Sequence, residues 1–342
     1  MPLAARRVFR LSLTTALCLA CAYAMGLDMP FIAPLFGFVL AAAAKPPMGL
    51  KGLLGVVLLL CLTLGIGLLL IPVLKHYPAT GLLLGALGQF YSNYLTLNLG
   101  KGPVGSLLTV GVALISAARL ASFELAIALI EALVIGITLG VLSLWMVYPL
   151  FPEDETPAAA APPPQADQSS WLALRATLIV YPSFLAGLIN PAAYLPIVMK
   201  AVSLGQQDSV TDAKHAGREL LGSTLLGGVL AALFWVLLGV LPNLWMFFLW
   251  MLLFSMYVGA KLYGVAASTY PPSFWINVMV TLLILLGPAV ADSANGKDPY
   301  TAFAVRMGLF IAVTLYAWLA VVLLEDWRER YHRRLAAASG PA

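Results

Sequence analysis

The segment that decides the fold spans residues 52–74 and reads GLLGVVLLLCLTLGIGLLLIPVL. It contains no charged residue, and Lys51 and Lys75 bound it at its two ends. A helix rises about 1.5 Å per residue, so this run reaches about 34 Å, enough to cross a hydrocarbon core of about 30 Å. The sequence therefore predicts a transmembrane helix here, and comparable apolar runs recur along the chain.

The overall composition is typical of a chain that folds in lipid. Of 342 residues, 61% are hydrophobic and only 10% are charged, and the mean hydropathy is +0.94. Soluble domains carry about 25% charged residues, so this chain lacks the charge that a water-facing surface needs. Its net charge of +4 forms no continuous basic face, which argues against a nucleic-acid partner. Cys18, Cys21 and Cys61 lie in apolar runs and show no disulfide pattern.

Reading the apolar runs between charged or Pro/Gly-rich breaks predicts an all-α polytopic membrane protein with about twelve transmembrane helices. Most of the segments are long enough to cross a bilayer. In chain order they are residues 11–25, 30–44, 52–74, 81–98, 104–118, 124–150, 171–188, 191–202, 220–241, 243–260, 273–290 and 303–324.

The distribution of basic residues predicts the orientation. With the N-terminus in the cytoplasm, all but four of the 19 Lys and Arg fall on the cytoplasmic side, Lys200 among them. Lys75, Arg119, Lys297 and Arg306 are the four on the other side. This bias matches the positive-inside rule and places both termini in the cytoplasm of a bacterial inner membrane. The first segment imitates a signal peptide, but its counterpart in the second half favours a retained helix.

A Pro/Ala-rich stretch, residues 152–170, divides the chain into two halves, 1–151 and 171–342. Such a composition predicts a solvated linker, here on the cytoplasmic side. The halves echo each other: residues 26–30 match 187–191, residues 51–55 match 218–222, and Arg10 matches Arg175. With six segments each, the halves are expected to be parallel repeats related by an axis along the membrane normal.

The second segment of each half is short and begins with a proline, Pro30 or Pro191. Short, proline-interrupted segments at matching positions are a sequence pointer to a transporter's binding region, and helix N-termini favour anions. Asp28 and Asn190 precede these prolines, and the alternative is that both are ordinary N-cap residues.

A polar and aromatic patch in the fourth segment supplies further candidates for substrate binding. It contains Gln89, Tyr91, Asn93 and Tyr94, and the tenth segment echoes it with Tyr257 and Lys261. Rings with hydroxyl and amide groups suit a planar, partly polar solute. The alternative is that these residues hold helices together or form an interfacial aromatic belt.

Glu131 lies inside the sixth segment, where an ionised carboxylate is costly, so it is the first candidate for a proton carrier. Asp28 is the second. The alternative for Glu131 is a structural ion pair with a basic residue such as Arg306.

Enzyme and metal motifs are missing from the sequence. It has no phosphate-binding GxxxxGK[ST] loop, no HExxH and no GxSxG, and its three histidines are scattered. We therefore expect neither an enzyme nor a cofactor. The charged stretch 203–221 is expected to form a solvated surface helix.

The basic start, the Gly26-Leu27-x-x-Pro30 turn, the two six-helix halves and their cytoplasmic join resemble the fusaric acid resistance and aromatic acid exporter superfamily, specifically a compact proteobacterial branch of unknown function. The resemblance implies proton-driven export of aromatic or other weak organic acids, with a periplasmic membrane-fusion protein and an outer-membrane channel as partners. The large cytosolic domain of many relatives is absent here. An organic-anion channel, or a non-transporting subunit of an efflux assembly, remains the alternative.

Overall fold

The computed structural model describes residues 1–43, 45–154, 169–205, 213–294 and 298–338, and all regular structure in these ranges is helical. Each of the twelve predicted segments coincides with a helical segment. The elements are α1 (Leu3–Ala24), α2 (Ile32–Ala42), α3 (Leu50–His76), α4 (Pro78–Leu97), α5 (Gly102–Val110), η1 (Gly111–Ile115), α6 (Ser116–Ala121), α7 (Phe123–Val147), α8 (Ser169–Ile189), α9 (Pro191–Gly205), α10 (Ala213–Val240), α11 (Leu244–Leu262), α12 (Pro272–Ala294) and α13 (Pro299–Ala338).

Nine of the described helices are long and apolar enough to cross a membrane. The other three predicted spans, α2, α4 and α9, do not meet these criteria, for two physical reasons. α2 has 11 residues and α9 has 15, so they reach only about 16 and 22 Å, short of the hydrocarbon core. α4 has 20 residues, but its polar patch lowers its hydropathy. The chain is thus a multi-pass membrane protein, and the count of twelve remains a prediction.

The fifth segment is a single rod interrupted by a π-helix. α5, η1 and α6 follow one another without a break, and all five residues of η1 are buried. Gly67 of α3 and Gly111 of η1 bring the two backbones together, because a Cβ on Gly67 would collide with the Gly111 carbonyl group. π-helices are rare and often occur at functional sites. The region where η1 lies beside α4 is therefore a candidate functional region.

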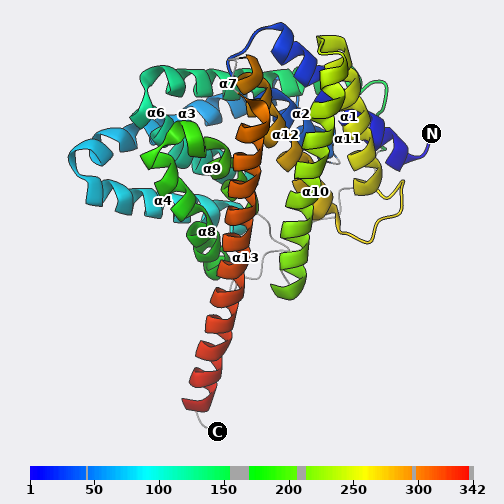
Figure 1. Ribbon diagram of the computed structural model, residues 1–342. Coiled ribbons are helices and arrows are strands. Elements are labelled where there is room, and N and C mark those ends of the chain that lie inside the picture. The colour runs from blue at the N-terminus through cyan, green and yellow to red at the C-terminus, as the bar shows by residue number, and fades with distance from the viewer. Residues whose placement is uncertain (44, 155–168, 206–212, 295–297, 339–342) are drawn as a thin grey trace.

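The two halves of the chain interleave. α1 packs against α11 of the second half, and α8 packs against α4 of the first half. In Figure 1, α3, α4 and α7 cross the direction of α10 and α13 instead of running beside them. The halves are therefore not two separate bundles, and their expected relation as parallel repeats stays a prediction.

α12 is the most enclosed of the candidate spans and contacts α2, α9, α10, α11 and α13. Its residues from Val278 to Leu286 form the centre of the largest apolar core, with Phe234, Met251 and Phe310 against them. An apolar helix in a membrane can face either protein or lipid, and α12 faces protein. By contrast, α3 leaves Leu54 and Leu69 more than 60% exposed, as expected of a lipid-facing helix.

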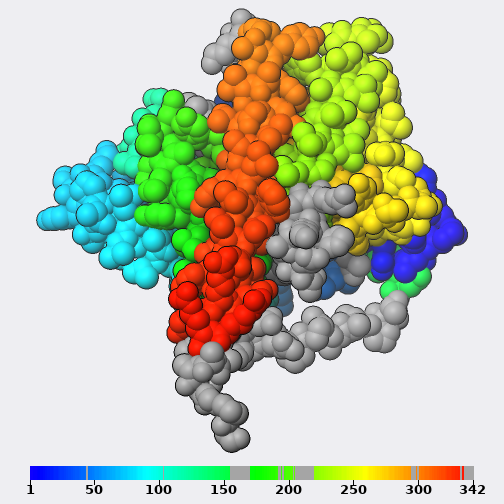
Figure 2. All heavy atoms as spheres, turned by 60° about the horizontal axis from the view of Figure 1, so that its bottom comes forward, coloured from blue at the N-terminus to red at the C-terminus, as the bar shows by residue number. Residues whose placement is uncertain are grey.

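α13 covers one face of the molecule. In the space-filling view of Figure 2 it runs as a continuous ridge between the green residues of α8 and α9 and the yellow-green residues of α10. Its last turns carry the ion pairs Arg330–Asp326 and Arg333–Glu329. Residues 155–168 of the predicted linker and 206–212 of the expected surface helix lie outside the described residues.

Candidate functional site

A fully buried lysine is the most unusual feature of the membrane-embedded region. Lys200 lies on the short helix α9 and has no exposed surface. Its Nζ donates to Asn277 Oδ1 at 2.6 Å and to Thr281 Oγ1 at 2.7 Å, both on α12. Asn277 Nδ2 in turn donates to Ser223 Oγ of α10 at 2.5 Å. We call these four residues the Lys200 cluster.

Every donor and acceptor in the hydrogen bonds of the Lys200 cluster can be assigned without conflict. Thr281 Oγ1 donates to the Asn277 carbonyl oxygen at 2.6 Å, so its lone pairs are free to accept from Lys200. Ser223 Oγ donates to the Leu220 carbonyl oxygen and so can accept from Asn277. Both amide atoms of Asn277 are thereby engaged, and the ammonium group is surrounded by neutral oxygens.

A buried ammonium group is costly unless it is paired with an anion. Among the described residues, no carboxylate forms an ion pair with Lys200, because both of its hydrogen-bond partners are neutral. Ionisable side chains in this setting usually mark a substrate or ion pathway. Sequence reasoning missed Lys200 because it assigned this residue to the cytoplasmic loops; its place within the apolar run 191–202 was the available signal.

A second buried polar group lies on α4, and we call it the α4 cluster. It comprises Gln89, Ser92 and Asn93 of α4, Thr109 of α5 and Thr177 of α8. Thr109 Oγ1 donates to Ser92 Oγ at 2.9 Å, and Asn93 Nδ2 donates to Thr177 Oγ1 at 3.1 Å. The predicted residue Asn93 thus joins the two halves, whereas the predicted residue Gln89 joins α4 to α5 of its own half.

The aromatic candidates lie apart from these clusters. Tyr91 is 57% exposed and Tyr257 is 46% exposed, while Tyr94 is half-buried beside Phe90. Lys261 donates to the carbonyl oxygen of Ala267 in the loop that follows α11. The structure therefore does not gather the predicted aromatic and polar residues into a single site.

Two adjoining pockets of about 520 and 260 Å³ open near the C-terminal ends of α1, α10 and α12. Tyr23 and Val290 line both, and Trp235 and Phe247 line the larger one. Three aromatic rings make it suited to a planar solute.

The smaller pocket is lined by the predicted residues Asp28 and Pro30. α2 begins at Ile32 and Phe31 is its N-cap, so Asp28 does not cap that helix. Asn190 and Pro191 lie at the junction of α8 and α9, outside the linings of these two pockets.

The expected Glu131–Arg306 pair is not formed. Glu131 lies on the exposed face of α7, whereas Arg306 Nη2 lies 2.5 Å from Asp292 Oδ2. Asp292 is nearer because α12 and α13 pack together at this end, and its neighbours Ala291 and Ser293 line the pockets.

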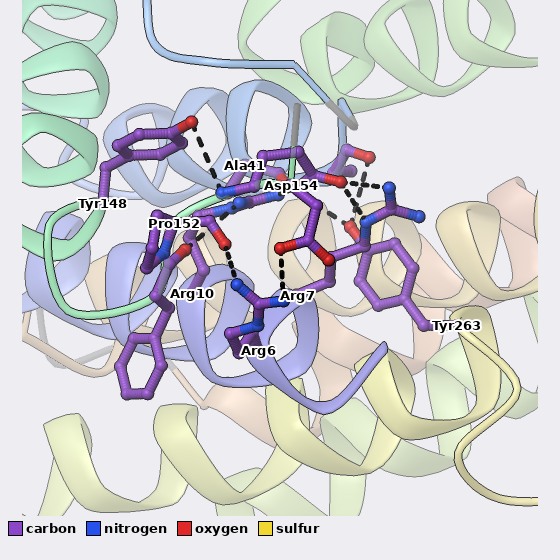
Figure 3. Close-up of polar contacts among 11 residues, drawn as sticks. Arg6, Arg7, Arg10, Ala41, Tyr148, Pro152, Asp154 and Tyr263 are labelled. Carbon is purple, nitrogen blue, oxygen red and sulfur yellow. Dashed lines mark hydrogen bonds and ion pairs between the residues drawn. The ribbon is translucent and has the colours of Figure 1, made fainter. Parts of the chain in front are cut away.

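Three arginines at the start of α1 converge on the short segment that follows α7 (Figure 3). Arg10 Nη2 lies 2.6 Å from Glu153 Oε2, Arg7 also bonds Glu153, and Arg6 lies 2.6 Å from Asp154. Burial alone would raise the pKa of Glu153, but hydrogen bonds from Arg7 and Arg10 and their charges lower it overall.

The second half contains a similar pair. Arg175 of α8 lies 3.0 Å from Glu325 of α13, and Trp171 also donates to Glu325. The two arginines that the sequence comparison matched thus each bind a glutamate near the end of the sixth segment of their own half.

The comparisons with known proteins give one match. A family model described as "Protein of unknown function (DUF2955)" matches residues 7–147, from the first turns of α1 to the last residue of α7. No curated protein and no solved structure matches the chain. The similarity is therefore to a family whose description states no activity, and it covers the first of the two halves.

Proposed function

We propose that this protein is a bacterial inner-membrane secondary transporter that exports aromatic or other weak organic acids, with Lys200 as the positive charge that attracts the anion. The observation that carries the proposal is the fully buried lysine with neutral hydrogen-bond partners. An organic anion supplies the negative charge that the described surroundings of Lys200 lack.

Lys200 lies nearer to one end of α12 than to the other, which supports entry of the substrate from that side of the membrane. Glu219 and Ser273 bond to each other at the first turns of α10 and α12. Asn277 and Thr281 lie one and two turns further along α12. With both termini in the cytoplasm, as the charge distribution predicts, this end faces the cytoplasm and the aromatic pockets near Tyr23 face the other side.

Two interleaved repeats are part of the proposal. The packing of α1 on α11 and of α8 on α4 supports it, because each first helix contacts the fourth helix of the opposite half. Two residues beyond Arg10 and Arg175, the Ser12 carbonyl oxygen lies 3.5 Å from Ser255 Oγ of α11, and Thr177 Oγ1 accepts from Asn93 of α4.

The resemblance to aromatic acid exporters supports the substrate class and the expected partners, a periplasmic membrane-fusion protein and an outer-membrane channel. Proton coupling through Glu131 belongs to the same proposal, since a carboxylate within a membrane helix is costly and usually functional. Glu131→Gln is expected to abolish gradient-driven export while expression is unchanged; undiminished transport would exclude this residue as the proton carrier.

The deciding experiment measures flux of labelled hydroxybenzoate in proteoliposomes with and without a pH gradient. Lys200→Met is expected to reduce flux at least tenfold, because the methionine keeps the length and removes the charge. Lys75→Met, at an exposed lysine, is the matched control. Equal flux in wild type and Lys200→Met would overturn the role of Lys200.

An organic-anion channel is the second candidate, and it is favoured by the same buried lysine, since basic residues line anion pores. The two differ in energetics: a channel gives flux that follows membrane potential at high turnover, whereas an exporter accumulates substrate against its gradient. Absence of flux with every solute would indicate a non-transporting subunit.

A further inference from the structure

The α4 cluster contains more hydrogen-bond acceptors than donors. Each hydroxyl has one proton, and all three protons are already used. Ser92 donates to the Gln89 carbonyl oxygen at 3.0 Å, Thr109 donates to Ser92 Oγ at 2.9 Å, and Thr177 donates to the Ala173 carbonyl oxygen at 2.7 Å. The hydroxyls therefore have no proton left for a further acceptor.

The same bonds fix the orientation of the two amides. Gln89 Nε2 faces the Thr109 carbonyl oxygen at 3.4 Å, and Asn93 Nδ2 faces Thr177 Oγ1 at 3.1 Å. The Thr109 carbonyl can only accept, and the Thr177 hydroxyl already gives its proton to Ala173, so exchanging amide N and O would lose these bonds. Gln89 Oε1 and Asn93 Oδ1 are consequently left without a donor among the described residues.

These two oxygens are deeply buried, since Gln89 is 0% and Asn93 is 1% exposed. Gln89 and Asn93 lie on one face of α4, four residues apart, and the Gln89 amide faces the carbonyl of Thr109, which lies two residues before the π-helix. Buried acceptors without a donor are rare and call for a missing partner. A water or a cation would supply it.

The Lys200 cluster indicates which partner fits. Its oxygens are of the same kinds, an asparagine amide and a threonine hydroxyl, and they surround a single positive charge. The α4 cluster also contains amide and hydroxyl oxygens, all of them neutral, but none of its members carries a charge. Neutral oxygens from side chains and from irregular helix turns are typical ligands for Na⁺ inside membrane transporters.

We propose that the α4 cluster binds one small monovalent cation, Na⁺, through Gln89 Oε1 and Asn93 Oδ1, with hydroxyl and backbone oxygens of Ser92, Thr109 and Thr177 available as further ligands. Cation binding stands without the proposed transport function. A role for Na⁺ as a coupling ion, entering as the organic anion leaves, rests on that function. Because the cluster joins α4 to α8, the bound ion would also hold the two halves together.

The test uses the purified full chain in detergent, with thermal unfolding followed as NaCl replaces choline chloride at constant ionic strength. Binding predicts an unfolding midpoint that rises with the logarithm of Na⁺ concentration, and about one ²²Na⁺ bound per chain. Gln89→Met, which keeps the length and removes the amide, is expected to lose both signals.

Two further variants keep the test informative if Gln89→Met does not fold. Asn93→Asp keeps the size and adds a negative charge, so it is expected to reach the same midpoint rise at a several-fold lower Na⁺ concentration. Thr224→Val, in the buried Thr224–Thr314 contact between α10 and α13, is the control and is expected to respond like the wild type.

A midpoint that is independent of Na⁺, or a Gln89→Met variant that responds like the wild type, would overturn the proposal and leave a buried water as the occupant. These results are separable from the transport assay. Na⁺ binding without anion flux would refute only the proposed function, and anion flux without Na⁺ binding would refute only this inference.

Discussion

The Lys200 cluster and the α4 cluster differ in the origin of their positive charge. Both are buried between helices, and both combine a carboxamide with hydroxyl oxygens. In the second half, the chain itself supplies an ammonium group, so the side-chain oxygens of Asn277 and Thr281 that face it are used. In the first half, two amide oxygens have no donor among the described residues. The difference indicates that the side-chain acceptors facing Lys200 find their donor within the chain, whereas the two amide oxygens of the α4 cluster need a partner from outside it.

The largest expected effect on stability comes from removing an acceptor from the Lys200 cluster. Asn277→Leu removes one of the two acceptors of Lys200, which is expected to cost about 2–3 kcal/mol of stability. Asn93→Leu removes an oxygen that lacks a donor, so in Na⁺-free buffer it should cost only about 1 kcal/mol. Thermal unfolding of the two variants measures the difference; equal losses would show that the clusters are equivalent.

A lysine placed in the α4 cluster should make the two clusters alike. In Gln89→Lys the new ammonium group takes the place proposed for Na⁺, so the unfolding midpoint should become independent of Na⁺. Gln89→Met also loses the Na⁺ response but offers no donor to Asn93 Oδ1, so Gln89→Lys is expected to be the more stable of the two variants in Na⁺-free buffer.

The arginine–glutamate pairs extend the comparison to the ends of the halves. Glu153 is 8% exposed and binds Arg7 and Arg10, whereas Glu325 is 28% exposed and lies in a looser pair. Glu153→Gln is therefore expected to cost about 1–3 kcal/mol, and Glu325→Gln less than about 1 kcal/mol. Unfolding midpoints of both variants test this order, and a larger loss for Glu325→Gln would contradict it.

The pH dependence is expected to be the smallest effect. Because its arginine partners lower the pKa of folded Glu153, its ionised form stabilises the fold at pH values above the ordinary glutamate pKa of about 4.3. This contribution should be lost as the pH falls below that value through the lowered pKa. Wild type should therefore lose more stability on acidification than Glu153→Gln; parallel pH curves would show that the carboxylate contributes little.

Much of the architecture follows from the sequence because it depends on local properties. Twenty apolar residues in a row satisfy the length and solvation demands of a bilayer wherever they occur, so the helical segments were predictable one by one. The short second segments were visible for the same reason, and α2 and α9 are indeed the shortest of the predicted spans in the described residues.

The site was only partly predictable, because it depends on which helices meet. Gln89 and Asn93 stood out as polar residues in an apolar run, but their two unpaired oxygens appear only when Thr109 and Thr177 are brought beside them. The pairing of Arg306 with Asp292 rather than Glu131 was hidden for the same reason, since both candidates are acidic and only helix packing selects between them.

The sequence by itself determined that this chain is a helical membrane protein, since hydropathy and residue spacing act within each segment, and the two echoing halves stay a prediction. Only the tertiary structure decided that the halves interleave through α1 with α11 and α4 with α8. It also decided that Lys200 is buried inside the protein and is not a loop residue. The physical reason is that desolvation of a charge is a property of its neighbours, and in this fold those neighbours, Asn277 and Thr281, lie more than 70 positions away in the chain.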